Sequence, residues 1–294
     1  MADLYLALPG GGLKGVAYAG ALAALDSMLL SDPRIRLRGS IGASIGALFA
    51  LAVLIDSGRG ILHKLGLELN AAELVPTLDP RRLVSKLALN GDLRAKVGHI
   101  VTNRLRLRAG TTFVEFTRRY DSDLVIVCSD LVSLRPVLCS SRLTPDMLIE
   151  EAIVASMSIP LLYDPVCHED YLLVDGAMHP LGPLIPFPRP RTICFGFRQH
   201  DISCRHLSPK PLLHGGIGQY LLRVMQMLLW SREPEPCQCV MYLNIYAGPL
   251  NALSFQCVRK DILIAIFQGM LTCANALYGN VDTIGVLLDP SGTK

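Results

Sequence analysis

The stretch Leu37–Ile55, LRGSIGASIGALFALAVLI, decides how the rest of the chain is interpreted. Its first part is typical of a strand, its last part is an unbroken apolar run that favours a helix, and the pentapeptide GASIG joins them. A serine between two glycines in a strand–turn–helix context is typical of a nucleophile elbow, which predicts a strained turn at Ser44 and tight backbone packing at Gly42 and Gly46. Because the chain has 25 glycines, the pentapeptide gains meaning only from partners elsewhere in the sequence.

The composition limits the class of protein. The chain has 294 residues, of which 51% are hydrophobic and 18% are charged, and its mean hydropathy is +0.38. We therefore expect either a large core or an apolar surface that faces lipid or a partner. The net charge of +3 is too small to indicate a nucleic-acid partner, and the arginines are not interleaved with aromatic residues.

The apolar segments and the cysteines predict a cytoplasmic protein. The apolar run Ile41–Ile55 has 15 residues, fewer than the roughly 20 that span a bilayer. The N-terminal stretch MADLYLALPGGG lacks the basic region of a signal peptide. Nine cysteines without metal-ligand spacing fit a reducing compartment and predict neither a zinc nor a redox site. Nothing else in the sequence implies a metal or an organic cofactor. Contact with membranes or lipid droplets would then be peripheral.

The first sixty residues predict two strand–helix units. Leu4–Pro9 reads as a buried strand and Lys14–Leu30 as a helix, with a glycine loop between them. Arg34–Ile41 reads as the second strand, and the helix after Ser44 continues to about residue 57. Such units favour an α/β fold with a mostly parallel sheet and helices on both faces. Residues 60–110 are less regular and suggest an insertion or cap beside the site.

The remaining segments complete one domain without a clear linker. The expected strands are Asp123–Ser129, Arg135–Ser140, Tyr171–Val174, Thr192–Phe197 and Val240–Tyr246, and the expected helices are Asp92–Leu105, Thr144–Ser156 and Asp261–Leu277. Thr144 is a suitable N-cap, with a proline at the first helical position. The nearly uniform apolar run Leu212–Trp230 fits a buried core helix or a lid that docks on a membrane.

The glycine loop GGGLKG, residues 10–15, allows two interpretations. It matches the G-x-G-x-x-G pattern of dinucleotide-binding proteins, which would make the protein an oxidoreductase. That interpretation requires an acidic residue near the end of the second strand, where this chain has only Ser40–Ser44. Alternatively, the backbone N–H groups of a glycine loop at a helix N-terminus form an oxyanion hole. The loop would then supply the anion site that a serine nucleophile needs.

A serine nucleophile also needs a base. A hydrolase of the Ser–Asp–His type would use one of the later histidines, namely His179, His200, His206 and His214. The elbow of that fold follows several earlier strands, whereas Ser44 has only one or two before it. None of these histidines lies in a distinctive strand-end context.

Asp175 has a more suitable context. It ends the short strand YLLV and is followed by Gly176 and Ala177, whose small side chains let another group approach the carboxylate. An aspartate beside the serine hydroxyl can orient it and accept its proton, which gives a Ser–Asp dyad. The same Asp-Gly pair could also simply form a turn.

Four motifs together resemble the patatin-like phospholipase family. They are GGGLKG at residues 10–15, GASIG at 42–46, ASMSIP at 155–160 and DGA at 175–177, in the order and at intervals similar to those of the family. Pro183 also lies where the family usually has a proline. The resemblance covers roughly residues 4–200, so we expect a catalytic core over 1–200 and an extension of the same domain over 201–294.

The resemblance implies a fold and an activity. The fold would be a three-layer α/β/α sandwich, and the activity would be hydrolysis of acyl esters of phospholipids or neutral lipids, with the lipid surface as partner. Ser44 would be the nucleophile and Asp175 the base. The oxyanion hole would consist of Gly10, Gly11, Gly12, Lys14 and Gly15, with backbone N–H groups of the three leading glycines as donors.

Two positions depart from the family pattern, and one alternative stays open. Lys14 stands where members commonly have arginine, and Leu181 stands where they commonly have asparagine. The same fold could also serve a catalytically silent lipid-binding protein.

Overall fold

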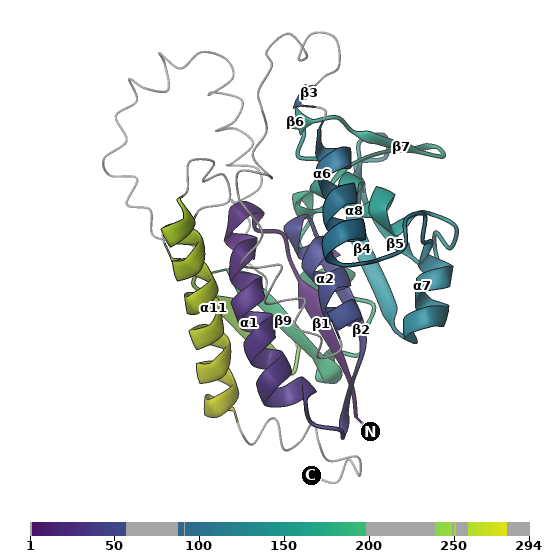
Figure 1. Cartoon of the computed structure of the whole chain (residues 1–294). Helices are drawn as coiled ribbons and strands as arrows, with labels where there is room; N and C mark the ends of the chain where they lie inside the picture. Colours follow the sequence, from purple (N-terminus) through teal and green to yellow (C-terminus); the bar gives the residue numbers. More distant parts are fainter. Residues whose placement is uncertain are drawn as a thin grey trace.

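A computed structural model describes residues 2–56, 88–90, 92–197, 239–248, 250 and 258–280 (Figure 1). Its main sheet has the strand order β10-β9-β1-β2-β4-β8-β7, and β5 pairs with β4. The strands of this sheet are β1 (Ala2–Leu8), β2 (Ile35–Ala43), β4 (Asp123–Asp130), β5 (Arg135–Ser140), β7 (Val166–His168), β8 (Tyr171–Asp175), β9 (Thr192–Phe197) and β10 (Met241–Ile245). A separate pair joins β3 (Ala88–Asn90) to β6 (Leu161–Tyr163).

The sheet is mostly parallel, as the two strand–helix units predict. β10, β9, β1, β2 and β4 pair in parallel, whereas β5, β8 and β7 pair in antiparallel fashion beside β4. The parallel alignment brings the carboxyl ends of β1 and β2 to one edge of the sheet, with Leu8 opposite Gly42. The glycine loop and Ser44 follow these two ends and therefore emerge side by side.

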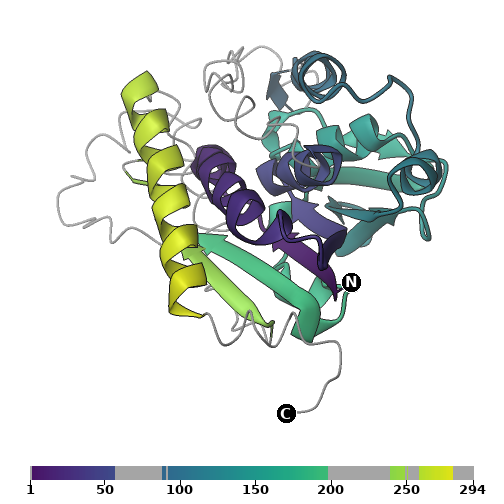
Figure 2. The ribbon, with the colours of Figure 1, turned by 60° about the horizontal axis from the view of Figure 1, so that its bottom comes forward.

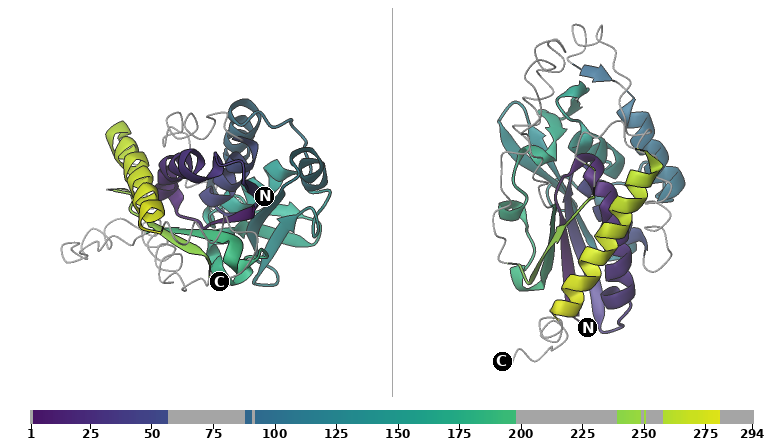
Figure 3. Two further views of the ribbon diagram at one scale, coloured as in Figure 1. Left: turned by 90° about the horizontal axis from the view of Figure 1, so that it is seen from below. Right: turned by 90° about the vertical axis from the view of Figure 1, so that its left-hand side faces the viewer.

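Helices cover one face of the sheet. The α-helices are α1 (Ala17–Leu25), α2 (Ile45–Asp56), α6 (Leu93–His99), α7 (Phe113–Tyr120), α8 (Ile149–Met157) and α11 (Arg259–Gly279). Short 3-10 or π turns are η1 (Gly12–Val16), η2 (Asp26–Leu30), η3 (Ile100–Arg104), η4 (Gly176–Met178), η5 (Gly182–Leu184) and η6 (Arg189–Arg191). Figures 2 and 3 show α1, α2 and α11 on the same face of the sheet.

Alternation along β1 divides the core between the two faces. Leu4, Leu6 and Leu8 are buried in the large cluster under the helices. Ala7 belongs to a smaller cluster on the opposite face, where residues 181–187 cover the sheet with Leu181, Ile185 and Phe187. In the described part of the chain, residues 181–187, which contain one 3-10 turn, therefore cover this second face.

The two helices α1 and α11 approach each other closely because both carry a glycine at the contact. A Cβ atom on Gly20 would lie 1.9 Å from the carbonyl oxygen of Ile266, and one on Gly269 would lie 2.1 Å from that of Ala17. The backbones thus touch without intervening side chains. This contact ties the C-terminal helix to the first helix of the chain.

Two helical stretches are long and apolar enough to cross a membrane by length and composition alone. Gly12–Leu30 is 67% buried inside the protein, as a core helix would be. Arg259–Gly279 is 28% buried, and Phe267 and Tyr278 on its outer side are 52% and 74% exposed. Neither stretch was predicted from the sequence to be a candidate span.

Most predicted elements lie where the sequence places them, but the start predicted for the helix at Thr144 is wrong. α8 begins five residues later, at Ile149, because Leu148 is extended and forms a β-bridge with Thr112. The Thr144 hydroxyl instead accepts a hydrogen bond from the N–H of Ser140, which closes the turn after β5. The apolar run 212–230, and residues 60–87 of the less regular region, lie outside the described residues.

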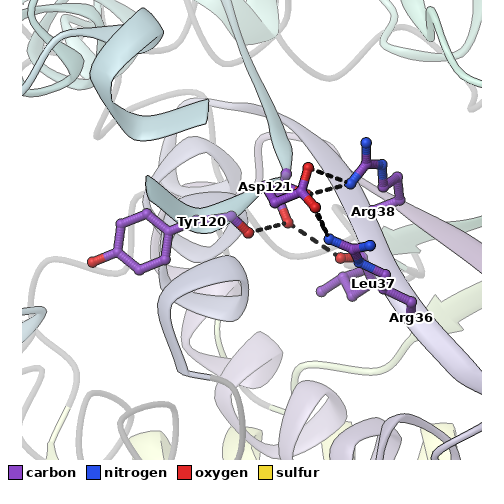
Figure 4. Close-up of polar contacts among 6 residues, drawn as sticks. Arg36, Leu37, Arg38, Tyr120 and Asp121 are labelled. Carbon is purple, nitrogen blue, oxygen red and sulfur yellow. Dashed lines mark hydrogen bonds and ion pairs between the residues drawn. The ribbon is translucent and has the colours of Figure 1, made fainter. Parts of the chain in front are cut away.

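The arginines of β2 lie at the edge of the sheet opposite the glycine loop. Arg36 and Arg38 both pair with the carboxylate of Asp121, which follows α7 in a left-handed conformation (Figure 4). The Arg38 Nη1 to Asp121 Oδ1 distance is 2.6 Å. These arginines therefore have a structural partner within the chain. A similar alternation, RLRLR, occurs at residues 104–108 and would predict a second strand there. That prediction is wrong, because Arg104 ends η3 and Arg106 has a φ of +57°.

Candidate active site

The turn at Ser44 has the strained geometry that the pentapeptide predicts. Ser44 lies between the end of β2 and the start of α2 with a φ of +53°, in the left-handed region that non-glycine residues seldom adopt. A Cβ on Gly42 would lie 2.3 Å from the carbonyl oxygen of Gly46, and a Cβ on Gly46 would lie 2.0 Å from that of Leu8. Both glycines are thus required by the close passage of the backbone.

Asp175 holds its carboxylate against the serine hydroxyl. Ser44 Oγ donates a hydrogen bond to Asp175 Oδ2 at 2.7 Å, and the N–H of Ala177 donates to Oδ1 at 2.8 Å. The backbone of Asp175 is fixed as well, because its N–H donates to the carbonyl of Ser158 and its carbonyl accepts from the Ser129 hydroxyl. The carboxylate is therefore oriented by its surroundings before any ligand is present.

Burial changes the acidity of this carboxyl group. Asp175 is 1% exposed and Ser44 is 5% exposed. Loss of solvation raises the pKa of Asp175 from 3.8 to about 7, and the hydrogen bonds from Ala177 and Ser44 oppose this rise by favouring the charged form. A carboxylate with this pKa can exchange a proton near neutral pH, which is what a general base requires.

The glycine loop lies directly over this pair. A Cβ on Gly10 would lie 2.5 Å from the Cβ of Ala177 and 3.1 Å from the Cβ of Ser44. Three motifs that are 27 or more residues apart in the sequence therefore meet within van der Waals distance. Gly12 has a φ of +52°, which favours glycine at that position.

The backbone N–H groups of the loop are available as donors. In the described part of the chain, no acceptor is hydrogen-bonded to the N–H groups of Gly10, Gly11 and Gly12. Tyr18 anchors the start of the loop, because its buried hydroxyl donates a hydrogen bond to the carbonyl of Pro9 at 2.7 Å. The arrangement offers several N–H groups beside a serine hydroxyl, as an oxyanion hole would.

The last two residues of the glycine motif differ in their surroundings. A Cβ on Gly15 would lie 2.3 Å from the side chain of Ile45, so Gly15 lets the loop pack on the first turn of α2. The Lys14 ammonium lies 5.7 Å from the centre of the Phe197 ring, and burial lowers the pKa of this lysine. The same ring lies against Gly11.

The structure also identifies groups to which the sequence reading gave no role. Ser156 belongs to the ASMSIP motif and contacts the N–H of Ser44 at 2.8 Å. Ser129 lies near the end of the predicted strand DLVIVCS and holds the carbonyl of Asp175. Both serines lie near the end of an element close to a motif, but this position alone does not distinguish them from ordinary buried serines.

Within the described residues, the side chain hydrogen-bonded to the Ser44 hydroxyl is the Asp175 carboxylate and not a histidine. Among the histidines considered as bases, residues 200, 206 and 214 lie outside the described residues, and His179 donates its backbone N–H to the carbonyl of Gly176. Within the described ranges no group of three or more His, Cys, Asp or Glu side chains could hold a metal ion.

Residues 6–185 match the family model described as patatin-like phospholipase. This segment is more than half of the chain and contains all four motifs. The chain belongs to the patatin-like phospholipase family. An uncharacterized protein of Acanthamoeba polyphaga mimivirus is 28% identical over 175 residues, a segment that covers 58% of this chain and 57% of the viral protein. The chain thus spans little more than half of that relative.

Two solved structures share the fold of this chain. VipD from Legionella pneumophila superposes with a TM-score of 0.56 at 16% identity, covering 94% of this chain and 67% of VipD. The type III effector protein ExoU from Pseudomonas aeruginosa superposes with a TM-score of 0.50 at 17% identity, covering 95% of this chain and 53% of ExoU. At these identities the likeness establishes the fold, and the activity must be argued from the site.

Proposed function

We propose that this family member is a serine lipid acyl hydrolase that cleaves carboxylic esters with a Ser44–Asp175 dyad. The observation that carries the proposal is the 2.7 Å hydrogen bond from the Ser44 hydroxyl to the buried carboxylate of Asp175, at a serine that Gly10 of the glycine loop also approaches. Family membership supports the lipid class of substrate. The strained turn at Ser44 supports the role of nucleophile, since such turns cluster at active sites.

The first half of the reaction acylates the serine. Ser44 Oγ attacks the ester carbonyl carbon while Asp175 Oδ2 accepts the hydroxyl proton. The carbonyl oxygen gains negative charge, which the N–H groups of Gly10, Gly11 and Gly12 stabilise by hydrogen bonds. The intermediate then collapses: the bond from carbon to the alcohol oxygen breaks, the alcohol leaves with the proton from Asp175, and an acyl ester remains on Ser44.

The second half repeats the sequence with water. Asp175 accepts a proton as water attacks the acyl carbonyl, the glycine loop again holds the oxyanion, and the proton returns to Ser44 Oγ as the fatty acid leaves. The buried carboxyl serves this cycle because it has a pKa of about 7 and so can both accept and return a proton. Backbone donors supply the charge stabilisation, and the scheme requires no metal or organic cofactor.

The substrate is an acyl ester of a phospholipid or a neutral lipid presented at a membrane or droplet surface. In this proposal the protein works peripherally on such surfaces in the cytoplasm. The predicted lid or docking helix at 212–230 lies outside the described residues, so it remains an expectation from its apolar sequence.

Two other functions were considered from the sequence. A dinucleotide-binding oxidoreductase would need space above the glycine loop, but the Phe197 ring and Ala177 already lie against Gly11 and Gly10. Membership of the patatin-like phospholipase family also argues against it. A catalytically silent lipid-binding protein has no such conflict, and only a test of reactivity separates it from a hydrolase.

A fluorophosphonate probe tests the proposal, because it forms a covalent bond with an activated serine. The full chain should be labelled at Ser44, as mapped by peptide mass spectrometry, and both Ser44→Ala and Asp175→Asn should lose labelling. Ser31→Ala is a matched control: its hydroxyl is exposed, donates to the carbonyl of Asp26 and lies away from the site. Labelling of the Ser44→Ala protein at another serine would contradict the assignment, and an unlabelled wild type would favour the silent lipid-binding protein.

A further inference from the structure

Ser156 is a buried hydroxyl group that the reaction scheme above does not use. It is 0% exposed in α8, one residue before the end of that helix. Its Oγ accepts a hydrogen bond from the N–H of Ser44 at 2.8 Å and donates one to the carbonyl oxygen of Val127 at 2.6 Å. Both functions of the hydroxyl, donor and acceptor, are thus occupied, and its orientation is fixed.

The N–H group that Ser156 holds belongs to the strained residue of the elbow. Ser44 has a φ of +53°, a conformation that is unfavourable for a residue with a side chain unless its surroundings hold it. The carbonyl of Ser44 accepts a hydrogen bond from the N–H of Ala47 in the first turn of α2. The start of the helix therefore fixes the peptide group on the C-terminal side of Ser44 only. The hydroxyl of Ser156 fixes the peptide group on the N-terminal side, through the N–H of Ser44.

The second partner of Ser156 connects the elbow to the neighbouring strand. Val127 on β4 is the register partner of Ala43, the residue directly before Ser44 on β2. Ser156 therefore bridges the two adjacent strand ends at the point where the chain turns into the elbow. Rotation of Ser44 out of its present conformation would break the hydrogen bond between its N–H and Ser156.

The same end of α8 also fixes the other half of the dyad. The carbonyl of Ser158, two residues later, accepts the hydrogen bond from the N–H of Asp175. A Cβ on Gly176 would lie 1.9 Å from the Val127 carbonyl oxygen and 3.2 Å from Ser156 Oγ, so the turn after Asp175 rests on this same bridge. One short segment thus holds the backbone of both reacting residues.

We propose that Ser156 is a positioning residue that holds Ser44 in its left-handed conformation, so that the Ser44 hydroxyl stays on Asp175 and beneath the glycine loop. The proposal rests on the hydrolase function proposed above. Ser156 acts through the Ser44 backbone and does not touch the substrate. Its removal should therefore slow the chemical step and leave binding of the probe unchanged.

The test separates the two steps with the fluorophosphonate probe on the full chain. The maximal labelling rate (kinact) should fall at least tenfold in Ser156→Ala, while the concentration for half-maximal rate (KI) stays within twofold of wild type. A loss of this size is expected when a reacting group is displaced by a fraction of an ångström to an ångström. Ser156→Cys, which keeps a weak donor and acceptor of similar shape, should give an intermediate kinact with the same KI.

Ser40→Ala is the matched control for a merely structural effect. Ser40 is also 0% exposed, and its hydroxyl donates to the carbonyl of Ala50 at 2.8 Å without touching the site. This variant should lose thermal stability and keep the wild-type kinact.

Each outcome decides between the two proposals. A wild-type kinact in folded Ser156→Ala or Ser156→Cys, or an equal loss in Ser40→Ala, would overturn the role of Ser156 while leaving the hydrolase proposal intact. An unlabelled wild type would overturn both. If Ser156→Ala does not fold, the kinact of Ser156→Cys decides alone.

Discussion

At the scale of single residues, the properties of the site depend on one buried carboxyl group. Asp175 has no room for water around most of its surface, and its pKa rises to about 7 although two hydrogen bonds favour the charged form. The charged form is the one that can accept the Ser44 proton. Function and folding therefore make opposite demands on the same group.

This conflict predicts opposite pH dependences for activity and stability. Esterase activity on a water-soluble ester should rise as the pH increases through about 7, because Asp175 must be ionised to act as a base. Stability should instead fall as the pH rises from about 4 to about 7. In the folded state the Asp175 carboxyl group keeps its proton up to about pH 7, whereas in the unfolded chain it loses the proton near pH 3.8. Between these values the folded state binds more protons, so the free energy of unfolding decreases as the pH rises.

Urea unfolding at several pH values measures the second effect. Between about pH 4 and 7 the free energy of unfolding of the wild type should decrease by an amount on the order of a few kcal/mol relative to Asp175→Asn, which carries no titratable group there. Asp175→Asn should be inactive throughout and at least as stable as wild type at pH 8. Parallel stability curves for the two proteins would contradict the raised pKa.

Candidate site residues could be predicted from the sequence where a motif contains them. The sequence reading singled out Ser44, Asp175 and the glycine loop as candidates, and the structure places them in contact. Their catalytic roles stay proposals. The hydroxyl groups of Ser156 and Ser129 could not be assigned beforehand, because their partners are backbone groups of distant strands and nothing in the local sequence distinguishes them from ordinary buried serines.

At the scale of elements, the apolar strands and long helices follow from the sequence pattern, but helix ends depend on distant contacts. Thr144 with its proline is a good local start signal, yet the pairing of Leu148 with Thr112 keeps the chain extended until Ile149. The Thr144 hydroxyl accepts a hydrogen bond from the N–H of Ser140 in the turn after β5 and does not cap the helix. A local propensity thus yields to a bridge between segments more than 30 residues apart.

The contact between α1 and α11 gives a prediction at this scale. In Gly269→Ala the new methyl group would lie 2.1 Å from the carbonyl oxygen of Ala17, so the helices must separate and lose packing along their contact. The free energy of unfolding in urea should fall by about 1–3 kcal/mol, the usual cost of overpacking. Gly279→Ala on the same helix is the control, because no atom lies within 4 Å of its added Cβ.

The control should match wild type or be slightly more stable, since alanine favours helix over glycine. Equal stability of Gly269→Ala and Gly279→Ala would mean that α11 does not rest on α1 in solution. The sequence could not anticipate this contact: an isolated glycine in a helical pattern does not reveal which backbone approaches it.

At the scale of the whole molecule, the four family motifs end at Ala177 and the family match ends at residue 185, yet the structure continues the same sheet and helix layer beyond them. β10 pairs with β9, and α11 packs on α1 with Ala265, Gly269 and Cys273 toward the core. We therefore expect residues 201–294 to belong to the same domain as the catalytic core.

Truncation tests this expectation. A chain that ends at Phe197 would leave β9 as an open edge strand and expose the small-residue face of α1, including Ala17 and Gly20, that α11 covers. Because that surface is apolar and closely fitted, the shortened chain should lose cooperative unfolding by circular dichroism, bind the dye ANS and fail to react with the fluorophosphonate. A shortened chain that unfolds cooperatively with the midpoint of the full chain would instead establish residues 1–197 as an independent domain. In that case residues 198–294 would lie outside the catalytic unit, and the hydrogen bond from Tyr18 to Pro9 would hold the glycine loop without α11.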